Sequence, residues 1–118
     1  MKEIKAVIQP FLLDKVLSAL EAIEGLPGVT VSQVLGWGVW RSTDRLNRDP
    51  GHAFSPKSKL EIVVSDELAP RVVKTIMDAA HTGNPGDGKI FVSEVDEVLK
   101  IRSGERLVEL SGGGKNGA

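Results

Sequence analysis

The sequence contains no cysteine and no tyrosine. Without cysteine the chain cannot form disulfides, thiolate zinc sites or a cysteine nucleophile. Other aromatic residues are scarce too, since there are only two tryptophans and three phenylalanines. A sheet that binds RNA needs exposed rings on which bases stack. The composition therefore argues against thiol chemistry and against a nucleic-acid partner.

Excess charge and long apolar runs are also missing. The 15 basic and 16 acidic residues give a net charge of −1, which provides no field to attract nucleic acid or a membrane surface. No segment reaches the roughly 18 apolar residues of a membrane span, and the N-terminal apolar run is too short for a signal peptide. We expect a cytoplasmic protein without membrane insertion, with one domain over residues 1–110 and a flexible tail over 111–118.

The hydrophobic pattern alternates between strand and helix periods. Residues 2–9 alternate, with Ile4, Ala6 and Ile8 on one face, and Pro10 ends this strand. Two apolar stripes with helical spacing follow: Leu13, Val16, Leu17, Leu20 and Ile23, then Leu68, Val72, Val73, Ile76 and Ala80. Further strands are predicted at 29–35, 59–65, 89–95 and, as a short fifth, 97–102.

The order β-α-β, long loop, β-α-β predicts an α+β fold, a ferredoxin-like split βαβ sheet (βαββαβ) with two helices on one face. Ser65 or Asp66 is expected to cap the second helix, and Pro70 is tolerated in its first turn. The other face of the sheet then lacks a cover. The candidates for that face are Val7, Val29, Val31 and Val64. An uncovered apolar face argues for an oligomer.

A long polar stretch, VWRSTDRLNRDPGHAFSPKS, occupies residues 39–58 and has no sustained period. Loops of this length in a compact domain are commonly functional or disordered. Trp40 and Phe54 are large aromatic residues, which exposed loops rarely carry unless they contact something. Two interpretations stay open, a solvated surface loop and an element that contacts a partner.

The segment TGNPGDGKIFV, residues 82–92, packs glycines, a proline, an aspartate and a lysine against the start of a strand. It is either a tight turn or an anion site. In the second case Gly86 and Gly88 leave backbone N–H groups accessible and Lys89 supplies charge, while Asp87 shapes the turn. The segment is not a P-loop, because GxxxxGK[ST] is absent and a strand follows.

A second glycine pair, GWG at residues 36–38, lies at the exit of the second strand. In a split βαβ sheet, two such loops can border one cleft that holds an adenine ring and a phosphate chain. Lys100 and Arg102 alternate onto one face of the predicted last strand. There they either assist the anion site or protect a sheet edge.

Catalytic candidates are few. Neither His52, in the loop, nor His81, near a helix end, has the spacing of a metal motif, although His52 stays open as a metal ligand. No GxSxG motif frames a serine nucleophile. We expect no catalytic activity and no obligatory cofactor.

The chain resembles the PII signal-transduction family over nearly its whole length, from Lys2 to about Gly104. The segments that carry the resemblance are IKAVIQPFLLDKVLSAL, GVTVSQVLGWG, KLEIVV and TGNPGDGKIFVSEV. The last is similar to the family's phosphate-gripping B-loop, and KIRSGE at 100–105 is similar to its C-terminal region. The resemblance favours the anion-binding interpretation of the glycine corner.

The resemblance implies a homotrimer that binds ATP, ADP or AMP, with or without Mg, in clefts between subunits. Positions that match the base and sugar side are Thr30, Gly36, Trp37, Gly38 and Val63. Positions that match the phosphate side are Gly86, Asp87, Gly88 and Lys89. Lys100 and Arg102 match two basic positions usually filled by arginine, and a lysine binds phosphate as a point charge.

The long loop, taken as residues 39–57, corresponds to the family's partner-contacting T-loop and departs from its pattern. After GWG the family usually has Arg and Gln, whereas this chain has Val39 and Trp40. That Gln helps to hold Mg and 2-oxoglutarate with ATP, so 2-oxoglutarate sensing is in doubt, although Lys57 matches a basic position that pairs with this ligand. The tyrosine that many bacterial members uridylylate is absent. The chain therefore resembles a divergent PII-like paralogue.

The resulting hypothesis is a sensor of adenine nucleotides that regulates a partner through residues 39–57. The partner's class stays open between a transporter, an enzyme and a transcription factor, and so does the sensed anion, 2-oxoglutarate, bicarbonate or another. The alternative is a trimeric structural or metal-tolerance protein that shares the fold without nucleotide sensing. The intact glycine corner argues against that alternative.

Overall fold

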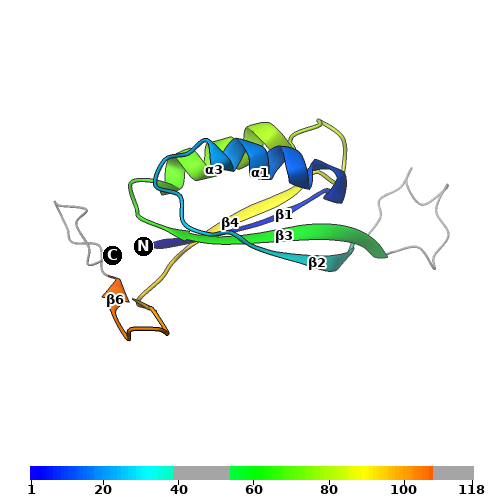
Figure 1. The fold of residues 1–118 in the computed structure, drawn as a ribbon. Helices are drawn as coiled ribbons and strands as arrows, with labels where there is room; N and C mark the ends of the chain where they lie inside the picture. The colour runs from blue at the N-terminus through cyan, green and yellow to red at the C-terminus, as the bar shows by residue number, and fades with distance from the viewer. Residues whose placement is uncertain (39–53, 108–118) are drawn as a thin grey trace.

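The computed structural model describes residues 1–38 and 54–107. A four-stranded antiparallel sheet has the strand order β2-β3-β1-β4. Its strands are β1 (Lys2–Ile8), β2 (Thr30–Trp37), β3 (Phe54–Val64) and β4 (Gly88–Glu94). Helices α1 (Leu13–Glu21) and α3 (Ala69–Ala80) lie on the same side of this sheet (Figure 1). The predicted α+β, ferredoxin-like architecture is confirmed.

The core lies between the two helices and one face of the sheet. Ile4, Ala6 and Ile8 on β1 are buried, as their alternation predicts. Both predicted helical stripes contribute Val16, Leu20, Ile23, Val72, Ile76 and Ala80 as buried residues and Leu13, Leu17, Leu68 and Val73 as partly buried ones. Each buried Leu, Ile or Val side chain contributes about 1.5–3 kcal/mol by leaving water.

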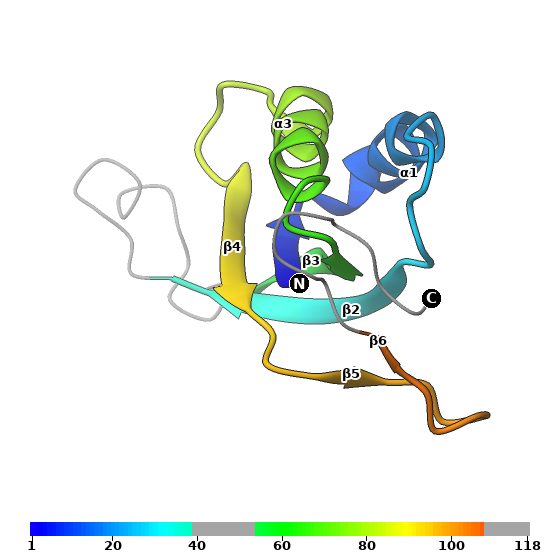
Figure 2. The same ribbon diagram turned by 90° about the vertical axis from the view of Figure 1, so that its left-hand side faces the viewer.

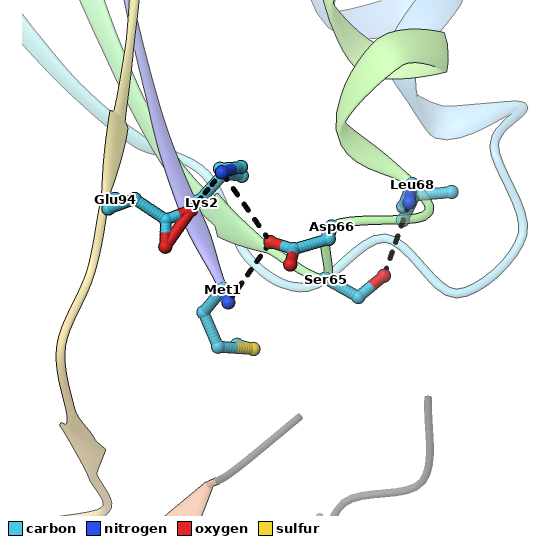
Figure 3. Close-up of polar contacts among 6 residues, drawn as sticks. All are labelled: Met1, Lys2, Ser65, Asp66, Leu68 and Glu94. Atoms are coloured by element: carbon cyan, nitrogen blue, oxygen red, sulfur yellow. Dashed lines mark hydrogen bonds and ion pairs between the residues drawn. The ribbon is translucent and has the colours of Figure 1, made fainter. Parts of the chain in front are cut away.

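Local signals set the beginning and end of the helices. β1 ends at Ile8, and Pro10 then starts the 3-10 helix η1 (Pro10–Leu12) that leads into α1. The Leu68 N–H donates to the Ser65 hydroxyl over 3.2 Å, so Ser65 caps the turn before α3 (Figure 3). Pro70 lies in the first turn of α3, where its missing N–H does no harm.

Ion pairs tie the start of the chain to the ends of β3 and β4. The Met1 amino group lies 3.2 Å from Asp66 Oδ1, and Lys2 pairs with Glu94 (Figure 3). The Val95 N–H also donates to the Met1 carbonyl oxygen over 3.1 Å. Because the charged groups are partly exposed, each pair adds at most about 1 kcal/mol.

The face of the sheet away from the helices is charged, so the predicted valine set is wrong except for Val7. Val64 is only 2% exposed within the core, Val31 pairs with buried Leu60, and Val29 packs against the core cluster. Residues that pair directly across strands share a face. Val7 pairs with Lys59 and with Lys89, and Lys5 pairs with Glu61 and Phe91.

β3 begins five residues before the predicted strand at 59–65. Residues 54–58, predicted as loop, pair with β2, where Trp37 faces Phe54 and Leu35 faces Pro56. Cross-strand aromatic and apolar pairs stabilise this extension despite the proline. The earlier part of the predicted loop, residues 39–53, lies outside the described residues.

The predicted fifth strand at 97–102 is mostly a turn. β5 (Val98–Leu99) pairs with β6 (Arg106–Leu107), and residues 101–103 turn between them. The Lys100 N–H donates to the Glu105 carbonyl oxygen over 2.8 Å, which closes this hairpin. Figure 2 shows the hairpin on the side of the sheet opposite to the helices. Lys100 and Arg102 therefore do not alternate along a strand.

Within residues 1–38 and 54–107, no helix has the length and apolar character needed to cross a membrane.

Candidate functional site

The glycine corner, residues 82–88, is organised around the Asp87 carboxylate. Asp87 Oδ2 accepts hydrogen bonds from the backbone N–H groups of Thr82, at 2.8 Å, and Gly83, at 2.9 Å. The Thr82 hydroxyl donates to Asp87 Oδ1. Because the charged carboxylate accepts these bonds, from the Thr82 hydroxyl above all, the pKa of Asp87 is lowered. The expectation that Asp87 shapes the turn agrees with this geometry.

Three glycines of the corner have positive φ angles, for which glycine is suited. Gly83, Gly86 and Gly88 have φ of +89°, +96° and +106°. Gly88 has a second requirement, because a Cβ there would lie 1.8 Å from the Val7 carbonyl oxygen. Gly88 is thus required by the close approach of β4 to β1, whereas the neighbours of Gly86 are the side chains of Gln9 and Lys57.

Lys57 on β3 supports the corner from the other side. Its Nζ donates to the Gly86 carbonyl oxygen over 2.7 Å. A Cβ on Gly86 would lie 3.0 Å from Gln9 Nε2 and 3.6 Å from Lys57 Nζ. The stem of Lys57 also passes Gly36, where an added Cβ would lie 3.4 Å from Lys57 Cγ. Lys57 therefore bridges the two glycine-rich segments.

Both glycine-rich segments border one open cleft of about 640 Å³. Of the predicted site residues, the cleft brings together Gly36, Trp37, Gly38, Gly86, Asp87, Gly88 and Lys89. It is also lined by Val7, Ser55, Lys57, Asn84 and Phe91. Trp37 and Phe91 are 62% and 52% exposed, so they offer apolar surface for a flat ring.

The glycine corner also contains backbone N–H groups that have no hydrogen-bond acceptor among the described residues. Its internal bonds use the N–H groups of Thr82, Gly83 and Asn84. Among the described residues, the N–H groups of Gly86 and Asp87 have no acceptor. Successive free backbone N–H groups form an anion-binding concavity. With Lys57 and Lys89 beside them, these donors can hold a phosphate group.

Four predicted site residues lie elsewhere in the chain. Thr30 and Val63 border a separate cavity of about 410 Å³, which Val98 and Leu107 also line. Thr30 and Gly36 are six residues apart on one strand, so these two predicted site residues are separated by about 20 Å. Lys100 and Arg102 belong to the β5–β6 hairpin, which follows the far end of β4 from the glycine corner (Figure 1).

Sequence reasoning omitted Val7, Ser55, Asn84 and Phe91 from the cleft, and it named Lys57 only as a match to a position that pairs with 2-oxoglutarate. Strand register contains the missing signal, because Val7 faces Lys89 and Gly36 faces Ser55 across neighbouring strands. Alternation alone puts Phe91 on the same face as Lys89.

Metal ligands do not gather in the described part of the chain, where no group of three or more His, Asp or Glu side chains is placed to hold an ion. His81 Nδ1 lies 3.7 Å from Asp87 Oδ2 at the edge of the corner. His52 and Trp40 lie outside the described residues.

Comparison with known proteins covers almost the whole chain. The family profile described as nitrogen regulatory protein P-II matches residues 1–105. The chain is 48% identical to the nitrogen regulatory protein P-II of Rhizobium meliloti (strain 1021), over 89% of this chain and 95% of that protein. It is 45% identical to the protein of the same name from Azospirillum brasilense, over 90% of this chain and 96% of that protein. The chain belongs to the nitrogen regulatory protein P-II family, a family of signalling proteins and not of enzymes, as the sequence predicted.

Proposed function

We propose that this P-II protein binds adenine nucleotides, ATP, ADP or AMP, in clefts between the subunits of a cytoplasmic homotrimer. In response it regulates a partner protein through the 39–57 segment. The observation that carries the proposal is the cleft itself. Free N–H groups of Gly86 and Asp87, two lysines and two exposed aromatic residues surround one space.

The cleft has the size and chemistry that a nucleotide requires. Its volume of about 640 Å³ lies within the range of roughly 300–1,000 Å³ for small-molecule sites. The backbone donors and Lys89 suit the phosphates. Trp37 and Phe91 suit the base, because an aromatic ring stacks on exposed apolar surface.

The separation of the predicted residues supports a site completed by a second copy. Thr30 and Val63 lie about 20 Å from the glycine corner along the strands, too far to share one ligand contact with it. In an oligomer, this end of one chain and the corner of another come together. The basic hairpin residues Lys100 and Arg102 then face the phosphates of the neighbouring chain.

Regulation through the 39–57 segment follows from where that segment leaves the sheet. Trp37 and Gly38 precede it, Ser55 and Lys57 belong to its return, and all four line the cleft. A ligand in the cleft therefore contacts both ends of the segment. Differential binding to two arrangements of the segment is what a switch requires.

Calorimetric titration of the native protein with ATP, ADP and AMP tests the nucleotide proposal. We expect binding by the native protein and weaker binding by Lys89→Ala, by roughly 10- to 100-fold if the contact is desolvated. Lys15→Ala is the matched control, because it removes the same charge from an exposed position on α1. Equal affinities in Lys89→Ala and Lys15→Ala contradict the site. No binding by the native protein contradicts the function.

Sedimentation at micromolar concentration tests the assembly, and a stable monomer of 12.6 kDa contradicts it. The alternative function, a structural or metal-tolerance protein, predicts no heat with nucleotides and saturable heat with a divalent metal. That pair of results would replace the proposed function with the alternative.

A further inference from the structure

The proposed phosphate site contains an acidic residue, which needs an explanation. Asp87 lines the cleft between Gly86 and Lys89, and its side chain is 25% exposed. A carboxylate next to a phosphate is electrostatically unfavourable, because like charges repel at short range. An acidic residue in a phosphate site therefore weakens anion binding, unless it also has a structural role that favours binding.

Asp87 uses both carboxylate oxygens inside the corner. Oδ2 accepts hydrogen bonds from the N–H groups of Thr82 and Gly83, and Oδ1 accepts one from the Thr82 hydroxyl. The same hydroxyl oxygen accepts the Asn84 N–H over 3.0 Å. The hydrogen bonds close a ring from the first residue of the corner to its sixth. The glycines inside this ring would otherwise sample many conformations, since glycine is the least restricted residue.

We propose that Asp87 and Thr82 are positioning residues, which lock the corner so that the N–H groups of Gly86 and Asp87 point together at a phosphate. This inference rests on the proposed nucleotide function and adds the device that preorganises the site. Neither side chain contacts the phosphate. Their effect acts through the backbone donors, whose ordering is completed before the ligand arrives.

The sign of one substitution separates positioning from simple electrostatics. Asp87→Asn removes the negative charge at nearly constant size. If Asp87 acted only by charge, its loss would strengthen ATP binding. If Asp87 positions the corner, its loss weakens ATP binding, because the neutral amide oxygen of Asn accepts the Thr82 and Gly83 N–H groups more weakly than a carboxylate does, and the NH2 group cannot accept the hydrogen bond from the Thr82 hydroxyl.

Thr82→Val provides a second variant that leaves every charge in place. It keeps the shape of the side chain and removes the hydroxyl that bonds Asp87 and Asn84. Thr82→Ser restores the hydroxyl. Thr75→Val is the control, because it makes the same change on α3, at a residue that does not line the cleft.

The experiment measures the affinities of native protein and variants for adenosine, ADP and ATP by calorimetry, with thermal unfolding of each variant. We expect Asp87→Asn and Thr82→Val to weaken ATP about 3- to 10-fold while adenosine changes less than about twofold, as loss of ordered phosphate donors predicts. Thr82→Ser and Thr75→Val should bind as the native protein does.

Three outcomes would overturn the inference: unchanged or tighter ATP binding in both variants, an equal loss for adenosine and ATP, and no recovery in Thr82→Ser. An equal loss for adenosine indicates general damage to the fold. Failure of the nucleotide function itself is recognised separately, because the native protein then binds none of the three ligands.

Discussion

Lys57 Nζ donates a hydrogen bond to the carbonyl oxygen of Gly86 over 2.7 Å, which links β3 directly to the glycine corner. Lys57 lies four residues after the end of the 39–53 segment. Through this bond, the part of β3 that follows the segment contacts the glycine corner.

Lys57→Met should loosen the corner without unfolding the protein. Methionine keeps the apolar stem that passes Gly36 and removes the ammonium donor. The loss of stability should stay below about 1 kcal/mol, because the bond is exposed to solvent. Amide hydrogen exchange should become faster across residues 82–88 and stay unchanged in α1. Unchanged exchange in the corner would show that Lys57 does not hold it.

Gly88→Ala should destabilise the whole fold. Its φ of +106° disfavours alanine, and the new Cβ would lie 1.8 Å from the Val7 carbonyl oxygen, so β4 must move away from β1. Strain and overpacking together predict a loss of about 3 kcal/mol or more in chemical denaturation.

The matched control for this prediction is Gly104→Ala. Gly104 has φ of +74°, and nothing lies within 4 Å of an added Cβ there, so only the backbone strain remains. A loss for Gly88→Ala no larger than that of the control would show that β4 yields easily at this point.

The pH dependence of the corner should follow Asp87. Its hydrogen bonds lower the carboxyl pKa below the ordinary value of 3.8, so the bonds stabilise the corner fully at pH above that value. The stabilisation is lost as the pH falls through the pKa of the folded state. The basic residues near Asp87 are His81, whose Nδ1 lies 3.7 Å from Asp87 Oδ2, and Lys57 and Lys89, which line the same cleft.

Carbon NMR of the Asp87 carboxyl during acid titration measures that midpoint. In Thr82→Val the midpoint should move upward, because the largest cause of the lowered pKa is removed. A midpoint at or above the ordinary value in the native protein would contradict the hydrogen-bond network.

Trp40 should limit the response to 2-oxoglutarate. An indole has one N–H donor and no oxygen for a hard cation such as Mg²⁺. We expect little 2-oxoglutarate binding by the native protein with Mg-ATP, and stronger binding after Trp40→Gln. Isothermal titration in the presence of Mg-ATP measures both. Tight binding by the native protein would mean that another residue, such as Asp44 or Lys57, completes the site.

Much of the fold could be predicted because its signals are local. The alternation in β1 and the two helical stripes identify the core, and Ser65 and Pro70 indicate where the turn into α3 begins. Which valines face away from the helices depends instead on the pairing between strands. A shift of one residue moves every side chain to the other face. This applies to Val31, whereas the alternation of Leu60, Ile62 and Val64 along β3 already places Val64 on the buried face.

The candidate site shows the same division. The glycines, Lys89 and the residues that hydrogen-bond to Asp87 are close in sequence, so the segment TGNPGDGK predicts that they lie together. Val7 reaches the cleft through strand pairing, which sets it beside Lys59 and Lys89, 52 and 82 positions away in the sequence. The Lys57 side chain reaches Gly86, 29 positions away, by its hydrogen bond. The position of Lys100 and Arg102 could not be predicted, because they lie in a hairpin whose two strands have only two residues each and show no periodic pattern.

β1 is the inner strand to which both walls of the cleft are attached, with β3 on one side and β4 on the other. Ile8 is paired both with Ser58, next to Lys57, and with Gly88, next to Asp87. A genetic screen for lost signalling would therefore recover changes at buried positions of β1 together with changes in the cleft. Only protein abundance and refolding yield would tell the two groups of alleles apart.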